Sequence, residues 1–363
     1  MRPGLALVCA LALILGGLAL LVWLIPAAPM TGDGQYYIQF VRNGLQHGAS
    51  SWHERRLLGP LLVRAMPLDA QQGFFVLTYA SLAATALLTW LAARVLVKEE
   101  VRALAAIPLL FGTWVVAPNL REYGLVDPLA WAFVAGVWLA TVKRRWAAAA
   151  VVAAIGVIAK EVVVLAAVAA AAAAFERDRP WRAVAVAAPA IVVALGLTVA
   201  FPGSGSDALA YVTKWVRDGL FSNGPLRAAF LLFASYGALW LLLPRAWPSL
   251  PAWLARAAAV YLAAAVVLPL VGSPERMEEA IFPVVVSGAL LATREWRLGL
   301  VWGLALGADL FAARVGGDAR LPTLLAWGGL LVACGLAAWA YVGAATRRRA
   351  GVARVSVSGK ESA

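Results

Sequence analysis

The sequence predicts an all-α, polytopic transmembrane protein with about twelve spans, and three observations lead to that fold class. Of the 363 residues, 63% are hydrophobic and only 14% are charged, and the mean hydropathy is +0.82. A water-soluble domain of this size does not tolerate so apolar a surface. Apolar runs recur along nearly the whole chain, and basic residues gather between alternate runs. Helices are expected because backbone amides without water must bond within their own segment.

The first predicted span, Leu5 to Ile25, follows Arg2 but is long for a signal peptide, so we interpret it as a retained helix. Further candidate spans, several of them short, are Phe74 to Val97, Ala103 to Ala117, Leu129 to Val142, Ala147 to Ala159, Val162 to Phe175, Ala183 to Phe201, Leu226 to Leu243, Trp253 to Val271, Ala280 to Ala292, Leu298 to Ala313 and Leu321 to Ala345. No linker separates them. Residues 1–345 are therefore predicted to form one transmembrane domain, and residues 346–363 a basic, disordered cytoplasmic tail.

The basic residues predict the orientation. If the N-terminus lies in the cytoplasm, most basic residues also fall on the cytoplasmic side, as the positive-inside rule requires. They include Lys143, Arg144, Arg145, Arg177, Arg179, Arg182, Arg245, Arg256, Arg294, Arg297, Arg347, Arg348 and Arg349. The C-terminus then also lies in the cytoplasm. The outer loops are longer and nearly balanced in charge, so we expect function on the side of the membrane away from the cytoplasm.

The longest outer loop, residues 26–73, carries two apolar stripes with helical spacing. One consists of Tyr37, Val41 and Leu45 beside Ile38, and the other of Leu58, Leu61, Leu62 and Met66. Such stripes are typical of short helices that lie in the membrane interface.

Several function classes lack support in the sequence. Cys9 and Cys334 lie in apolar runs, and the two histidines cannot form a multi-histidine metal centre. The net charge of +12 is explained by topology, so no nucleic-acid partner is predicted. Nucleotide-binding, zinc-protease and serine-hydrolase motifs do not occur in a suitable context.

Asp33 is the first candidate for a catalytic base. It follows the first span and is flanked by Gly32 and Gly34, which allow a sharp turn that brings the carboxylate close to a ligand. An N-cap role for a helix that begins at Gln35 is an equally good interpretation.

Glu122 is a second acidic candidate, on the outer side between the third and fourth spans. It has no simple local explanation. Asp127, which precedes Pro128, is instead expected to cap the following helix.

Lys160 and Glu161 interrupt an alanine-rich stretch of nearly thirty apolar residues. Two half-length helices that meet at this pair on the outer side would place Lys160 and free helix amides near an anion, which predicts a phosphate site. The alternative is an exposed turn whose side chains reach water.

Arg56 and Arg276 are predicted phosphate ligands, because a guanidinium binds phosphate in a bidentate manner. A solvated salt bridge with a neighbouring glutamate is the commoner role for either arginine. Tyr37 and His53, in the first outer loop, are further candidates for contact with substrate.

The layout resembles the GT-C superfamily of integral-membrane glycosyltransferases. The resemblance is carried by Gly32-Asp33-Gly34-Gln35-Tyr36-Tyr37, by Arg55-Arg56-Leu57-Leu58-Gly59-Pro60-Leu61-Leu62, by Lys160-Glu161, and by Pro274-Glu275-Arg276 before Phe282-Pro283. It implies transfer of a sugar from a polyprenyl-phosphate donor to a glycan, lipid or protein acceptor on the extracytoplasmic face, with inversion at the anomeric carbon. Asp33 would be the base, and Arg56, Lys160 and Arg276 would hold the phosphate.

The chain departs from the family in one respect. Members often carry paired acidic residues in the first loop, whereas Gly34 follows Asp33 here. No cofactor is predicted, although a divalent cation at Asp33 stays open. The rival interpretations are a transporter or flippase, in which the charges line a path, and a noncatalytic protein with the same fold.

Overall fold

The computed structural model describes residues 3–25, 32–45, 51–113, 116–201, 213, 217, 236–267 and 279–292. The described part is helical and contains no strand, which confirms the all-α prediction for these residues. The helices are α1 (Pro3–Leu24), α2 (Asp33–Asn43), α3 (Ser51–Glu54), α4 (Leu58–Arg64), α5 (Ala70–Val97), α6 (Glu100–Leu104), α7 (Ala106–Phe111), α8 (Val116–Arg121), α9 (Asp127–Val142), α10 (Trp146–Ala159), α11 (Val163–Ala174), α12 (Trp181–Ala200), η2 (Gly237–Leu242), α15 (Leu243–Ala246), η3 (Trp247–Ser249), α16 (Ala252–Val267), η5 (Glu279–Ile281) and α18 (Phe282–Ala292).

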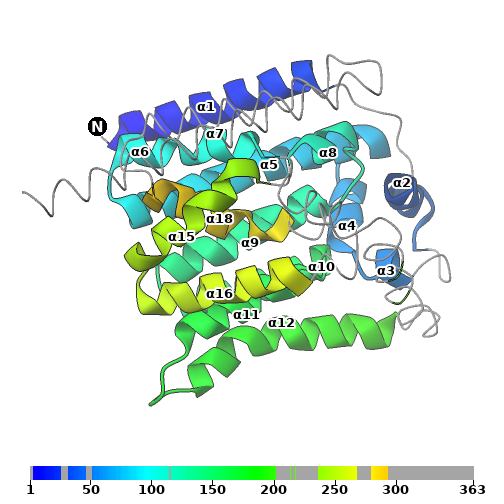
Figure 1. The fold of residues 1–363 in the computed structure, drawn as a ribbon. Coiled ribbons are helices and arrows are strands. Elements are labelled where there is room, and N and C mark those ends of the chain that lie inside the picture. Colours follow the sequence, from blue (N-terminus) through cyan, green and yellow to red (C-terminus); the bar gives the residue numbers. More distant parts are fainter. Residues whose placement is uncertain are drawn as a thin grey trace, which may run out of the picture.

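The longer helices lie side by side with their axes roughly aligned (Figure 1). Helix α5 packs on α9, while α10 and α11 pack against α12, and α11 also packs against α16. Small residues allow this close approach. At Gly156 in α10, an added Cβ would lie 2.6 Å from Cβ of Phe133 and 2.8 Å from Cγ1 of Val163, so only glycine fits between α9 and α11.

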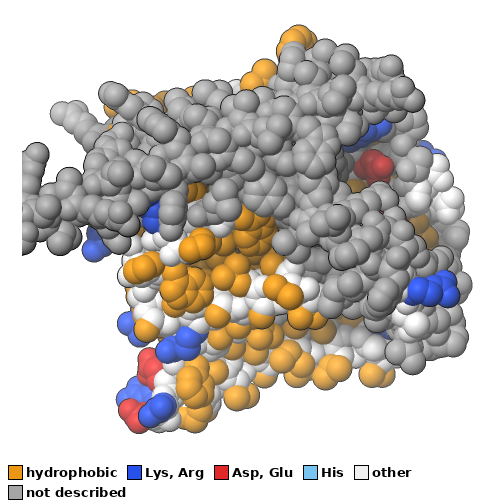
Figure 2. Space-filling view, in the orientation of Figure 1, with side chains coloured by type: hydrophobic (Ala, Val, Ile, Leu, Met, Phe, Trp, Pro, Cys, Tyr) orange, Lys and Arg blue, Asp and Glu red, His pale blue; other side chains and the backbone are white. Residues whose placement is uncertain are grey.

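Within the described part of the chain, three helices are long and apolar enough to cross a membrane, namely Pro3–Trp23, Ala70–Val97 and Trp181–Ala200. Helix α12 turns large apolar side chains outward, with Val199 80% exposed and Val184 66% exposed. Hydrophobic side chains cover much of the face formed by α16 and the helices below it in Figure 2. An uncovered apolar surface of this kind indicates association with a membrane.

The shorter apolar helices α9, α10, α11, α16 and α18 match predicted spans, but the segment predicted from Ala103 to Ala117 is broken. Gly112 ends α7, and the Thr113 hydroxyl donates a hydrogen bond to the Leu110 carbonyl (2.7 Å), in competition with a continuing helix. The last two predicted spans, the tail and most of Leu226 to Leu243 lie outside the described residues. The number of spans therefore stays a prediction.

The two apolar stripes of the first loop have different surroundings. Tyr37 and Ile38 of α2 are buried within the protein, whereas Leu61 and Leu62 of α4 are 49% and 38% exposed. Helix α4 packs instead through Val63, which approaches Gly73 so closely that an added Cβ would lie 2.6 Å from Val63 Cγ1. The outward leucines of α4 suit contact with lipid.

Helices α10 and α11 form a hairpin, with its turn at one end of the bundle and its two open ends at the other. The two ends of the bundle differ in their charged residues. At one end, Arg144 lies 3.6 Å from Glu176, and the Arg256 guanidinium donates to the Phe175 carbonyl (2.7 Å). We call this end, defined by the connections 143–145 and 175–182, the basic end. The opposite end holds the turn at residues 160–162 and helices α2, α3 and α4 (Figure 1), and we call it the site end.

Candidate functional site

Asp33 begins helix α2 at the site end. Gly32 occupies the N-cap position with φ of 52°, in the left-handed region that favours glycine, and makes no side-chain cap. The N-cap interpretation of Asp33 is therefore wrong. Its Oδ1 atom lies 2.9 Å from Nε2 of His53, with the side chains 30% and 18% exposed. As expected from the sequence, a glycine places this carboxylate at a sharp turn. The structure adds that His53 lies next to it.

His53 is held among aromatic rings. Its ring centroid lies 4.8 Å from that of Tyr36 and 5.5 Å from that of Tyr37. Neither of its ring nitrogens makes an aligned hydrogen bond within the described residues. The contact with Asp33 is therefore a short distance between the two groups without hydrogen-bond geometry. Tyr37 is 1% exposed, and this burial raises the pKa of its phenol, which is neutral at physiological pH.

Arg56 joins the aromatic group to the distant Glu161. Its Nε donates to Oε2 of Glu161 (3.0 Å) and its Nη2 to Oε1 (2.5 Å), a bidentate pair, while Nη1 donates to the Tyr37 hydroxyl (3.3 Å). Burial of the guanidinium acts to lower its pKa, but the effects of Glu161, Tyr37 and Asp127 together outweigh this, so the pKa of Arg56 lies well above its ordinary value. Burial acts to raise the pKa of Glu161, but the charges of Arg56 and Lys160 and the hydrogen bonds to the carboxylate together outweigh it, so that pKa is lowered.

Lys160 pairs with Asp127 in the interior. The ammonium donates to Oδ1 of Asp127, and the two side chains are 6% and 2% exposed. The nitrogen also lies 5.8 Å from the centroid of the Trp131 ring. A buried charge is tolerated when a partner of opposite sign and an aromatic face accompany it.

Two predictions at this pair are wrong. Asp127 is the first residue of α9 and Val126 is the N-cap, so the cap interpretation fails. Lys160 is buried and paired, so the exposed-turn interpretation is wrong for Lys160, whereas the Glu161 side chain is 42% exposed. The first amides of α11 are also occupied, since Val163 and Val164 donate to the carbonyls of Lys160 and Glu161 (3.2 and 3.0 Å). The half-helix arrangement itself is present, with α10 and α11 meeting at the site end.

Glu122 lies at the same end, in the connection between α8 and α9, and is partly buried. No hydrogen bond or ion pair joins its carboxylate to the Asp33 or Arg56 groups within the described part of the chain. Arg276 falls outside the described residues. The structure thus brings Asp33, Tyr37, His53, Arg56, Lys160 and Glu161 together at one end, and does not bring Glu122 into contact with them.

Sequence reasoning missed the role of Asp127. A signal that hints at this pairing is the position of two opposite charges, each at the end of an apolar helix, because each needs a partner once it is buried. Sequence reasoning also missed Glu54, which is only 5% exposed beside His53. Within the described residues, no group of three or more His, Cys, Asp or Glu side chains is arranged to hold a metal ion.

The chemistry of the site follows from these contacts. A partly exposed carboxylate beside an imidazole can accept a proton from a bound hydroxyl. The buried pairs fix the elements around it, because moving either helix would leave a charge without its partner. Comparisons with protein family models, curated proteins and solved structures found no match.

Proposed function

We propose that this chain is a polytopic membrane glycosyltransferase of the GT-C type, with about twelve spans. It would move a sugar from a polyprenyl-phosphate donor to an acceptor on the extracytoplasmic face of a bacterial cytoplasmic membrane. The observation that carries the proposal is the position of Asp33. It follows α1 directly, is 30% exposed, and contacts His53 at the end of the bundle opposite the basic connections.

In the proposed reaction, Asp33 takes the proton of the acceptor hydroxyl. The acceptor oxygen forms a bond to the anomeric carbon as the bond from that carbon to the phosphate oxygen breaks, with inversion. The lipid phosphate leaves with the electron pair. His53, whose Nε2 lies 2.9 Å from Oδ1 of Asp33, would restrict the positions that the carboxylate can take.

Arg56 and Lys160 act differently from the sequence-based expectation. Each already holds a carboxylate, Glu161 and Asp127 respectively. In the proposal these pairs keep the site rigid, while Arg276 remains a proposed direct ligand of the leaving phosphate.

Transport receives less support. In α1, α5 and α9–α12, every charged side chain lies within the first or last turn. A transport path through the membrane normally places ionisable groups near the midplane. The charges of the described helices are concentrated at the two ends instead.

The test is a transfer assay in membranes from cells that produce the protein, which also supply the acceptor. A panel of radiolabelled polyprenyl-phosphate-linked sugars serves as donor. We expect Asp33→Asn to lose at least about 100-fold of the transfer rate, the typical contribution of a general base. The matched control is Asp178→Asn, the same change at an exposed position of the basic end. Transfer retained by Asp33→Asn would contradict the proposal.

A further inference from the structure

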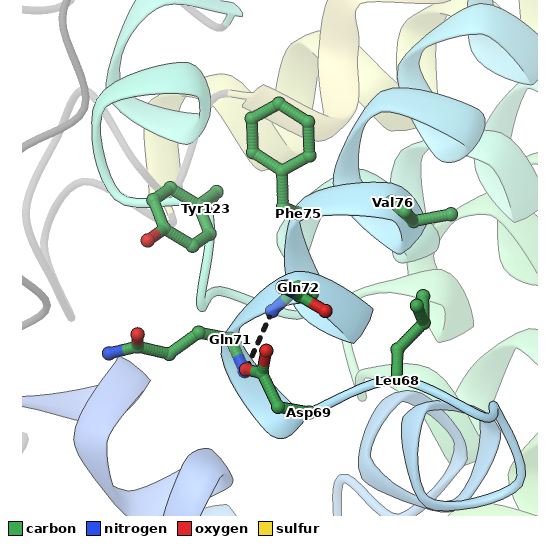
Figure 3. A pocket seen from close by; sticks show the side chains of 7 residues that line it. All are labelled: Leu68, Asp69, Gln71, Gln72, Phe75, Val76 and Tyr123. Atoms are coloured by element: carbon green, nitrogen blue, oxygen red, sulfur yellow. Dashed lines mark hydrogen bonds between the residues drawn. The ribbon is translucent and has the colours of Figure 1, made fainter.

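A second feature of the site end is a shallow hollow of about 470 Å³ at the start of α5. It lies beside the connection that carries Tyr123, and its lining side chains are shown in Figure 3. Two carboxamides, of Gln71 and Gln72, stand on one side, and the rings of Phe75 and Tyr123 on the other. These residues take no part in the contacts of Asp33 described above.

The hollow is held in shape by hydrogen bonds. Oδ1 of Asp69 caps α5 by accepting from the backbone amides of Gln71 (2.8 Å) and Gln72 (3.1 Å), which fixes the turn that bears the carboxamides. The Thr78 hydroxyl donates to the Tyr123 carbonyl (2.8 Å), which ties the connection to α5. A site formed in advance in this way loses little entropy on binding.

The aromatic side of the hollow is both ordered and open. Phe75 meets Tyr123 edge to face, at 5.7 Å between centroids and 80° between planes, and contacts Tyr79 at 4.4 Å. Phe75 nevertheless keeps 42% of its surface exposed. An exposed ring beside polar side chains offers an apolar face and hydrogen bonds to one ligand at the same time.

The lining chemistry selects the class of ligand. Each carboxamide donates and accepts hydrogen bonds, as a vicinal pair of hydroxyl groups requires. The C–H face of a pyranose ring packs on an aromatic ring. Among the described residues that line the hollow there is no Lys or Arg, and the charged one is Asp69, so an anion such as phosphate is disfavoured.

We propose that this hollow binds a neutral saccharide unit, stacked on Phe75 and hydrogen-bonded by Gln71 and Gln72. The ligand is either a soluble glycoside or the headgroup of a glycolipid, which present the same chemistry. This binding does not depend on the proposed transfer at Asp33.

The test is saturation-transfer NMR on the full chain in phospholipid nanodiscs, because alkyl glycoside detergents would compete. One arm uses the methyl glycosides of glucose, galactose, mannose and N-acetylglucosamine, and a second arm uses nanodiscs containing the corresponding dialkyl glycosides. We expect Phe75→Ala to bind the responding sugar about three- to tenfold more weakly. Phe175→Ala, the same change at a 43% exposed position of the basic end, serves as the control and should bind as the native chain does.

Response in the first arm identifies a soluble ligand, and response in the second arm alone identifies a glycolipid. Asp33→Asn should bind either probe normally, so failure of the transfer proposal leaves this result intact. Absence of binding in both arms, equal binding by Phe75→Ala and the native chain, or saturation transfer to phospholipid acyl chains alone would overturn the assignment.

Discussion

The two ends of the bundle use charge in opposite ways. At the basic end, Arg182 and Glu176 pair six residues apart in sequence (2.9 Å), with side chains 27% and 39% exposed. At the site end, Lys160 and Asp127 pair across 33 residues with side chains 6% and 2% exposed, and Arg56 and Glu161 pair across 105 residues with side chains 11% and 42% exposed. Ion pairs between residues close in sequence and open to solvent are typical of a hydrated surface. Buried ion pairs between distant segments instead stabilise one particular arrangement of the helices.

The ion pairs at the two ends also differ in how much they contribute to the free energy of unfolding. An exposed ion pair contributes about 0 to 1 kcal/mol, because water screens it and two long side chains lose freedom. A buried pair costs desolvation that its attraction only balances, yet removal of one partner leaves an unpaired charge and is strongly destabilising. The site end should therefore be far more sensitive to single charge removals than the basic end.

The largest effect is expected at Lys160. Lys160→Met leaves the Asp127 carboxylate buried without its ammonium, and we expect a loss of about 3 to 5 kcal/mol in the free energy of unfolding. Denaturant titration in mixed micelles, followed by tryptophan fluorescence, measures it.

The double variant Lys160→Met with Asp127→Asn removes both charges and tests the cause. It should recover most of the lost free energy, because no unpaired charge remains. If the double variant is as unstable as the sum of both single changes, the pair does not account for the effect.

A smaller, pH-dependent effect is expected at Glu161. Its side chain is 42% exposed, so Glu161→Gln should cost only about 1 to 3 kcal/mol at pH 7. Since the pKa of Glu161 is lowered in the folded protein, its stabilising effect is complete above the unfolded pKa of about 4.3 and is lost as the pH falls through the folded value. The difference between native chain and variant should therefore shrink below about pH 4.

The smallest effect is expected from the same substitution at the other end. Glu176→Gln removes the partner of Arg144 and Arg182, both of which remain in contact with water. Its cost should be within about 1 kcal/mol under the conditions used for Glu161→Gln. Equal costs at the two positions would show that the ends do not differ.

Much of the fold could be predicted from the sequence because hydropathy acts locally. The apolar runs that became α5, α9, α10, α11 and α12 were found to within a few residues. The break after Phe111 was missed, since Gly112 and Thr113 interrupt a run that remains apolar throughout.

The site was predicted less completely, because its contacts join distant segments. Asp33 and Lys160 stood out as charges next to apolar runs. Their partners depend on how the helices pack. The positions of Lys160 and Asp127 at helix ends hint at their pairing, but nothing in the local pattern selects Glu161 for Arg56. The cap interpretation, which was the expectation for Asp127 and the alternative for Asp33, was wrong for both, because it considers only local sequence.

The central claim is that the site end faces away from the cytoplasm and carries the function there. The most direct test is to measure which end of the bundle is accessible from outside the cell. In a chain with Cys9 and Cys334 replaced by alanine, Gln72→Cys places a thiol on the site end and Arg179→Cys places one on the basic end, both at exposed positions. A membrane-impermeant maleimide is then applied to spheroplasts. We expect labelling of the Gln72→Cys variant in intact spheroplasts, and of the Arg179→Cys variant only after permeabilisation. The reverse pattern would place the Asp33 site in the cytoplasm and contradict the account.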